Sequence, residues 1–156
     1  MDAMNLTARP ATRSDLPDLL DLYQHLLPGD DRPTMENAAQ VFDRFLTYEG
    51  SAILVVEVGG VLIASCTLVV VPNLTRGGRP YGLIENVVTH GHFRKRGYGK
   101  QVLAAASSAA WDAGCYKVML MTGSTKPETL RLYLDAGLEQ SKTGFQMRHI
   151  VARTES

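Results

Sequence analysis

Glu85 begins the stretch of this chain whose residue types are best suited to chemistry, ENVVTHGHFRKRGYGK, which ends at Lys100. Its carboxylate stands among leucine, isoleucine and valine residues, where a buried and unpaired charge costs on the order of several kcal/mol. We therefore expect Glu85 to face a polar or wet cleft, where it could accept a proton. An ion pair with a nearby arginine or exposure at a splayed strand edge would fit the same residue. Asn86 could hold a ligand or accompany an irregularity in the strand.

The end of the same stretch, RKRGYGK, has the composition of an anion-binding turn at the start of a helix. A helix N-terminus offers unpaired backbone N–H groups and the positive end of the helix dipole. Gly97 and Gly99 would let the backbone approach a large anion such as a pyrophosphate, and the surrounding cations would neutralise its charge. The spacing matches neither a Walker loop nor a GxGxxG fingerprint. A solvated basic turn is the alternative interpretation.

The surrounding sequence predicts a strand before this turn and a helix after it. Ser14 and Thr34 are predicted N-caps of two early helices, because each precedes apolar residues at helical spacing. Two β-branched runs on either side of Gly59-Gly60 predict a hairpin. In chain order, the predicted elements are a strand at 6–12, helices at 14–27 and 34–46, strands at 51–58, 61–71 and 81–89, a helix at 98–113, a strand at 116–122, a helix at 127–136 and a strand at 144–151.

The composition limits the classes of function. At 156 residues the chain has the length of one domain. Its 16 Lys and Arg balance its 16 Asp and Glu, so no overall field favours nucleic acid or an anionic membrane. The longest apolar run, Val61–Val71, is too short to span a bilayer, and the first residues lack a signal-peptide pattern. Cys66 and Cys115 lack metal or disulfide spacing, so we expect a soluble, cytoplasmic protein with reduced core thiols.

Arg94, Gly97 and Gly99 match the R/Q-x-x-G-x-G/A signature of the GNAT-type N-acetyltransferases, and the order of predicted elements resembles that fold over nearly the whole chain. The resemblance implies a single α+β domain at residues 3–153. Its sheet would be mixed and mostly antiparallel, with six to seven strands, a splayed centre and about four flanking helices. Strand edges near the C-terminal strand and the apolar hairpin also suggest a homodimer.

The same resemblance implies acetyl-CoA as cosubstrate and no metal, and the four histidines show no metal-binding spacing. A strand backbone would pair with the pantetheine arm, and the glycine-rich turn would surround the pyrophosphate. The implied cofactor-binding residues are Val87, Val88, Thr89, Arg94, Lys95, Arg96, Gly97, Tyr98, Gly99, Lys100 and Thr129. Thr129 stands where an asparagine is common in the family, and Thr89 stands where a valine is common, so these contacts depart in detail from the family pattern.

Glu85 and Tyr133 are the implied catalytic residues. An amine is mostly protonated near neutral pH, so Glu85 would accept its proton, directly or through water, when the amine attacks the thioester. Tyr133 would lie near the CoA sulfur and give a proton to the leaving thiolate, and core packing beside Leu130 and Leu134 is its alternative role. A backbone N–H near Val87 or Val88 would polarise the thioester carbonyl.

The implied reaction moves acetyl from acetyl-CoA to a primary amine of a small molecule. A non-catalytic acetyl-CoA sensor and a protein or peptide N-acetyltransferase are the alternatives, and zero net charge disfavours an RNA-binding module. Parts of the sequence look somewhat like glucosamine-phosphate and aminoalkylphosphonate N-acetyltransferases, whose acceptors are anionic. Arg76 and Arg79 could bind such an acceptor, although solvated loop cations are the preferred interpretation. His25 could reach the acceptor cleft from the first helix.

Overall fold

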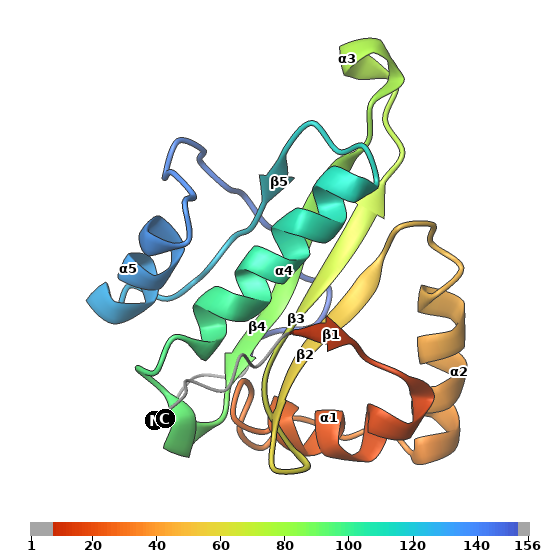
Figure 1. Cartoon of the computed structure of the whole chain (residues 1–156), viewed down its shortest axis with the longest axis vertical. Helices are drawn as coiled ribbons and strands as arrows, with labels where there is room; N and C mark the ends of the chain where they lie inside the picture. Colours follow the sequence, from red (N-terminus) through yellow and green to blue (C-terminus); the bar gives the residue numbers. More distant parts are fainter. Residues whose placement is uncertain (1–7, 153–156) are drawn as a thin grey trace.

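The β-branched runs of the chain form the sheet at the centre of the computed structural model, which describes residues 8–152 (Figure 1). The predicted hairpin is confirmed, and Gly59 and Gly60 turn the chain with φ of 57° and 81°. The strand order is β1-β2-β3-β4-β5, and only the β4–β5 pair is parallel. The strands are β1 (Arg9–Pro10), β2 (Ala52–Val58), β3 (Val61–Val71), β4 (Tyr81–Thr89) and β5 (Val118–Met119).

Two early helices begin at different kinds of cap. Thr34 is confirmed as an N-cap, because its hydroxyl accepts the Asn37 N–H at 3.1 Å. Ser14 is not a cap: it lies inside a short 3-10 turn, which is organised by Asp15, whose carboxylate accepts the Thr12 N–H at 2.7 Å. The helices are α1 (Leu16–Tyr23), α2 (Met35–Phe45), α3 (Thr75–Gly78), α4 (Tyr98–Asp112) and α5 (Pro127–Asp135), with 3-10 turns η1 (Arg13–Asp15) and η2 (Gly91–Phe93).

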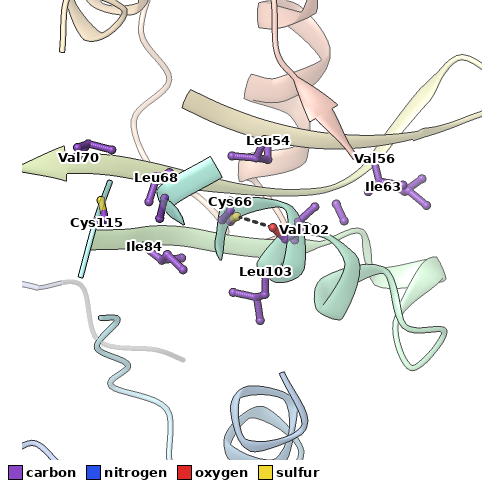
Figure 2. Close-up of a cluster of buried hydrophobic side chains, with 13 residues drawn as sticks. Leu54, Val56, Ile63, Cys66, Leu68, Val70, Ile84, Val102, Leu103 and Cys115 are labelled. Carbon is purple, nitrogen blue, oxygen red and sulfur yellow. Dashed lines mark hydrogen bonds between the residues drawn. The ribbon is translucent and has the colours of Figure 1, made fainter. Parts of the chain in front are cut away.

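The sheet is covered on both faces, which explains why its strands are apolar without interruption. Neighbouring residues Val55 and Val56 are both fully buried, and they belong to two different core clusters. One cluster joins the sheet to α4, and the other joins it to α1 and α2. Figure 2 shows the α4 cluster, in which the Cys66 thiol donates to the Val102 carbonyl at 3.4 Å. Burial raises the pKa of this thiol to about 12, so it stays protonated.

The sheet has fewer strands than the predicted six to seven. The predicted strand at 116–122 is reduced to Val118–Met119, which pairs only with Gly82 and Leu83 of β4. This pairing ends at Leu83, and β4 carries an irregularity a few residues further on, between Glu85 and Val88. The expected splay of the sheet therefore lies between β4 and β5.

The predicted C-terminal strand at 144–151 is also not formed within the described part of the chain. Its apolar side chains are almost fully exposed, with Phe145 at 91% and Met147 at 99%. No neighbouring strand extends far enough to pair with this segment, because β5 is only two residues long. The alternating pattern is therefore present without the partner that a strand needs.

Four of the helices, α1, α2, α4 and α5, have eight or more residues, as the predicted number of helices requires. The fifth, α3, is a short turn in the loop 72–80, where Arg76 and Gly77 have left-handed backbone conformations. Figure 1 shows this loop projecting at the end of β3 and β4, away from the other helices. No helix in residues 8–152 is long and apolar enough to cross a membrane.

Candidate active site

A β-bulge in β4 shapes the centre of the site. Thr67 of β3 pairs with Glu85, and Ser65 pairs with Val88, so two residues of β4 stand opposite Cys66 alone. One of these two is Asn86, whose φ of 53° is left-handed, a conformation that asparagine tolerates better than most residues. The bulge follows the last residue of β4 that pairs with β5, Leu83. The irregularity that the sequence suggested at Asn86 is confirmed.

A pocket of about 230 Å³ occupies the split between β4 and β5. Its lining comes from four parts of the chain: residues 26–27 after α1, residues 84–87 at the bulge, residues 120–123 after β5, and Tyr133 of α5. The strand edge from Ile84 to Thr89 pairs with no residue of β5 in the part of the chain that the structure describes. Backbone groups on this side are therefore free to bind a ligand at the pocket wall.

Glu85 and Tyr133 reach this pocket from opposite faces of the sheet. Glu85 lies on the same face of the sheet as its cross-strand partner Thr67. This is the face on which α1 packs, and Tyr23 of α1 contacts Thr67 there. Tyr133 packs against the other core cluster, together with Val87 and α4. The two predicted catalytic side chains therefore line one pocket from its two ends.

The two groups differ in their environment. The Glu85 side chain is exposed and forms no ion pair or hydrogen bond within residues 8–152. Tyr133 is half-buried, and burial, with a smaller effect from Cys66, raises the pKa of its hydroxyl. Tyr133 therefore stays protonated across the neutral range and can act as a proton donor. Tyr133 also packs against the core cluster of α4, so the alternative of a packing role stays open beside the predicted catalytic one.

Tyr23 and Thr67 are site neighbours that the sequence did not reveal as such. Burial raises the pKa of the Tyr23 hydroxyl, and a hydrogen bond with Thr67 offsets part of that rise. Thr67 is buried and stands directly across from Glu85. A tyrosine at helical spacing in α1 gives no signal of this contact, because the contact depends on how α1 docks on β3 and β4.

The glycine-rich turn links β4 to α4. Gly97 is the N-cap of α4 with φ of 86°, and Lys95 also has a left-handed φ of 64°. The Gln101 N–H donates to the Gly97 carbonyl at 3.1 Å and closes the first turn of α4. The backbone N–H groups that precede Gln101 in the helix have no intrahelical acceptor and can therefore donate to a ligand. Lys95, Gly97 and Lys100 are exposed. This arrangement can bind an anion at the start of α4.

Three predicted cofactor-binding residues of the turn also have structural contacts. Arg94 donates to the Thr89 carbonyl at 3.3 Å and to the His25 carbonyl at 3.4 Å, so it ties the end of β4 to the segment after α1. Arg96 lies over the Phe93 ring, 5.4 Å from its centroid. Tyr98 is half-buried, and its ring centroid is 6.3 Å from that of Phe93.

Gly99 is a packing glycine. A Cβ at this position would lie 3.3 Å from a Leu132 methyl group and 3.5 Å from the Thr89 hydroxyl oxygen. Because Gly99 is buried, it lets α4 approach α5 and β4, and this approach holds Tyr133 of α5 near the pocket. The sequence motif predicted that both Gly97 and Gly99 lie against the anion. In the structure Gly97 is exposed and Gly99 is buried, so only Gly97 is open to a ligand.

The remaining predicted contacts lie along β4 and α5. Val87 lines the pocket, whereas the side chain of Val88 is buried in the α1 cluster, so only its backbone is available to a ligand. Thr89 is half-buried at the end of β4. Thr129 is half-buried one helical turn before Tyr133 and therefore lies on the same side of α5.

His25 does not line the pocket; Leu26 and Leu27 do. Its Nδ1 accepts the Gly91 N–H at 3.2 Å, and its ring centroid is 4.0 Å from that of His90. Burial, with the charges of His25, His92 and Arg94, lowers the pKa of His90. No group of three or more His, Cys, Asp or Glu residues that could hold a metal is found among the described residues.

Comparisons with known proteins show the family to which this fold belongs. The family model described as "Acetyltransferase (GNAT) family" matches residues 16–138. The chain is 31% identical over 119 residues to the glucosamine 6-phosphate N-acetyltransferase of Trypanosoma brucei brucei, covering 76% of this chain and 81% of that protein.

Solved structures share the fold over almost the whole chain. A candidate acetyltransferase from Agrobacterium tumefaciens str. C58 is 46% identical with a TM-score of 0.86, covering 92% of this chain and 100% of that one. An aminoglycoside N-acetyltransferase in complex with CoA is 19% identical with a TM-score of 0.76, covering 92% and 94% of the two chains. The chain belongs to the GNAT family of acetyltransferases.

Proposed function

We propose that this protein transfers the acetyl group of acetyl-CoA to a primary amine of a small molecule, by direct attack of the amine on the thioester. One observation carries the proposal: Glu85 and Tyr133 line the same pocket, in the split of the sheet that the β4 bulge opens. A proton acceptor and a proton donor at the two ends of one pocket suit a reaction that removes a proton from an amine and supplies one to a thiolate.

The residues around the pocket fit acetyl-CoA. The N–H groups at the start of α4, with Lys95, Arg96 and Lys100 around them, suit a pyrophosphate. The unpaired edge of β4 beyond Ile84 suits the amides of a pantetheine arm, which could bind as an additional strand. The buried Gln101 side-chain oxygen, in the first turn of α4, has no hydrogen-bond donor among the described residues and could accept one from a ligand.

Glu85 is proposed as the base. Acetyl-CoA supplies an activated thioester when it is bound, and the acceptor amine becomes nucleophilic only when it has lost its proton. The exposed Glu85 carboxylate has no counter-ion within residues 8–152, so it can accept that proton directly or through water. Backbone N–H groups near Val87 and Val88 are proposed to stabilise the charge that develops on the acetyl oxygen.

Tyr133 is proposed as the acid. Its hydroxyl lines the pocket on the α4 and α5 side, and its raised pKa keeps it protonated at neutral pH. The Tyr133 hydroxyl can therefore donate a proton to the CoA sulfur as it leaves. Thr129, one turn earlier on the same side of α5, is proposed to contact the pantetheine arm.

We also propose a homodimer of single-domain chains. Four apolar side chains of the C-terminal segment, Phe145, Met147, Ile150 and Val151, are each at least 80% exposed. Such a run is typical of a surface that another chain covers. Light scattering at working concentration measures the assembly, and a monomer would contradict this part of the proposal without affecting the proposed chemistry.

The test of the function is acetyl-CoA consumption with a panel of amino sugars, amino alcohols, amino acids, polyamines and peptides, with mass spectrometry of the products. We expect a product heavier by one acetyl group and one free CoA per product. Binding of acetyl-CoA without turnover of any amine would identify a sensor instead. Turnover of peptides alone would identify a protein or peptide N-acetyltransferase.

A further inference from the structure

We propose that the acceptor is a hydroxyl-bearing amine that carries no phosphate or other anionic group, such as an unphosphorylated amino sugar or amino alcohol. This inference rests on the proposed function and names the substrate class of the same pocket. It is carried by the charges of the side chains that line the split of the sheet.

The lining contains one carboxylate and no cation. Among residues 8–152, eleven line the pocket; none of them is a lysine, arginine or histidine, and Glu85 is the one carboxylate. This carboxylate forms no ion pair with any residue from 8 to 152. An uncompensated negative charge attracts an ammonium group and repels a phosphate. The field of the pocket therefore favours the amine and disfavours an anionic substituent beside it.

The cations that could have bound an anionic acceptor lie elsewhere. Arg76 lies over the Tyr116 ring at 5.6 Å, in the loop that projects at the far end of β3 and β4 (Figure 1). Arg79 precedes Glu85 by six positions, a span of roughly 20 Å along extended chain. Arg94 donates to the carbonyl groups of Thr89, at the end of β4, and of His25, after α1. Arg76 and Arg79 are both exposed and do not line the pocket, which supports the preference for loop cations over an acceptor site.

The polar groups that do line the pocket are neutral. Asn86 is exposed at the bulge and carries both an amide donor and a carbonyl acceptor, and Thr122 carries a hydroxyl. Amides and hydroxyls suit the hydroxyl groups of an amino sugar or amino alcohol, whereas bound phosphates are usually held by arginine, lysine or several backbone N–H groups. Leu26, Leu27 and Met121 provide apolar walls for the carbon skeleton.

Matched pairs of acceptors test the inference. Glucosamine and glucosamine 6-phosphate share the same amine and ring, and ethanolamine and phosphoethanolamine form a second pair. Two quantities are measured for each member: kcat/KM with acetyl-CoA, and Kd for the protein saturated with CoA, which requires no turnover. We expect the unphosphorylated member to be favoured in both quantities by about tenfold or more, as one repulsive charge contact near a protein surface would give.

A substitution that adds a cation to the pocket should reverse this preference. Met121 lines the pocket and is 65% exposed, so Met121→Lys adds a charge without burying it. We expect the ratio of the two Kd values to shift toward the phosphorylated member by about tenfold. Leu74→Lys is the matched control, because Leu74 is 97% exposed in the projecting loop and its substitution adds the same charge far from the pocket. It should leave the ratio unchanged.

The outcomes separate the inference from the proposed function. Preference of the wild-type protein for the phosphorylated members would overturn the inference and leave the acetyl transfer intact. Failure of every member to bind, or an equal shift in Met121→Lys and Leu74→Lys, would also overturn it. Binding of the unphosphorylated members without acetylation would support the inference about the pocket while contradicting the proposed function.

Discussion

The two halves of the candidate site differ in charge and in the way their backbone is held. The cofactor half, residues 94–100, has four cations and no carboxylate, and its turn is fixed by left-handed conformations at Lys95 and Gly97. The acceptor half is the pocket in the split between β4 and β5, where the acceptor amine would meet the thioester; its lining in residues 8–152 has one carboxylate and no cation.

The difference shows why the two tasks are separated. A cation beside a catalytic carboxylate stabilises its charged form and makes it a weaker base. A carboxylate beside the glycine-rich turn would repel the phosphates. The chain keeps both groups on one strand-turn-helix segment, with the bulge and the end of β4 between them. The predictions for Glu85, Tyr133 and Gly97 each affect one half and leave the other intact.

Removal of the proposed base should have the largest effect. Glu85→Gln keeps the shape of the side chain, so acetyl-CoA should still bind, but turnover near neutral pH should fall by roughly 10²–10⁴. Steady-state kinetics and the acetyl-CoA dissociation constant are measured together. Glu49→Gln, which removes an exposed carboxylate outside both halves, is the control. Wild-type turnover in Glu85→Gln would show that another group accepts the proton.

Removal of the proposed acid, Tyr133, should lower turnover less than removal of the proposed base. A thiol has a pKa of about 8.5, so the leaving thiolate is already fairly stable in water. We expect Tyr133→Phe to lower turnover by about 10–10², with little change in acetyl-CoA binding, because only a hydroxyl is lost. The single-turnover rate is the quantity to measure. A rate equal to that of the wild-type protein would leave Tyr133 as a packing residue on α5.

Substitution in the cofactor half should weaken only the binding of acetyl-CoA. A valine at Gly97 has open space around its Cβ but must adopt a φ of 86°, at a backbone cost of about 1–2 kcal/mol. Gly114 has the same open space and a φ of 83° at the other end of α4, so Gly114→Val is a matched control for strain.

We expect both glycine variants to lose similar thermal stability. Only Gly97→Val should lose most of the stabilisation that acetyl-CoA gives to the folded protein, measured as the ligand-dependent shift in Tm. Equal shifts in the two variants would place the pyrophosphate elsewhere.

The smallest expected effect is on the stability of the fold, at the ion pair that precedes α1, and it involves neither half of the candidate site. The Arg9 guanidinium donates to Asp15 at 2.7 Å, and together with the Thr12 N–H it lowers the pKa of this carboxyl group from 3.8 to about 2. A lowered pKa in the folded state gives stability that is present above about pH 4 and is lost as the pH falls toward 2.

The Arg9 side chain is 39% exposed, so solvent screening reduces the effect, and Asp15→Asn should cost about 1–2 kcal/mol at pH 7. Urea unfolding at pH 7 and at acid pH measures this difference. The cost should shrink in acid, and turnover at neutral pH should be unchanged. A cost that does not depend on pH would show that the ion pair is not its cause.

The sequence predicted features that depend on neighbouring residues. The hairpin at Gly59-Gly60, the cap at Thr34 and the strand-turn-helix around Gly97 follow from local conformational preferences. It did not predict features that depend on docking between distant segments. The contact of Tyr23 with Thr67 needs α1 to lie on the sheet, and the predicted strand at 144–151 needs a neighbouring strand longer than the two residues of β5.

The pH dependence of single-turnover acetylation most directly tests the claim that a base and an acid act from the two ends of one pocket. Wild-type protein, Glu85→Gln and Tyr133→Phe are compared with one good acceptor, so that CoA release does not limit the rate. The deficit of Glu85→Gln should shrink as the pH rises, because free amine replaces the lost base, whereas the deficit of Tyr133→Phe should persist at each pH. A Glu85→Gln deficit that stays constant with pH, or a Tyr133→Phe deficit that disappears in alkali, would contradict this account.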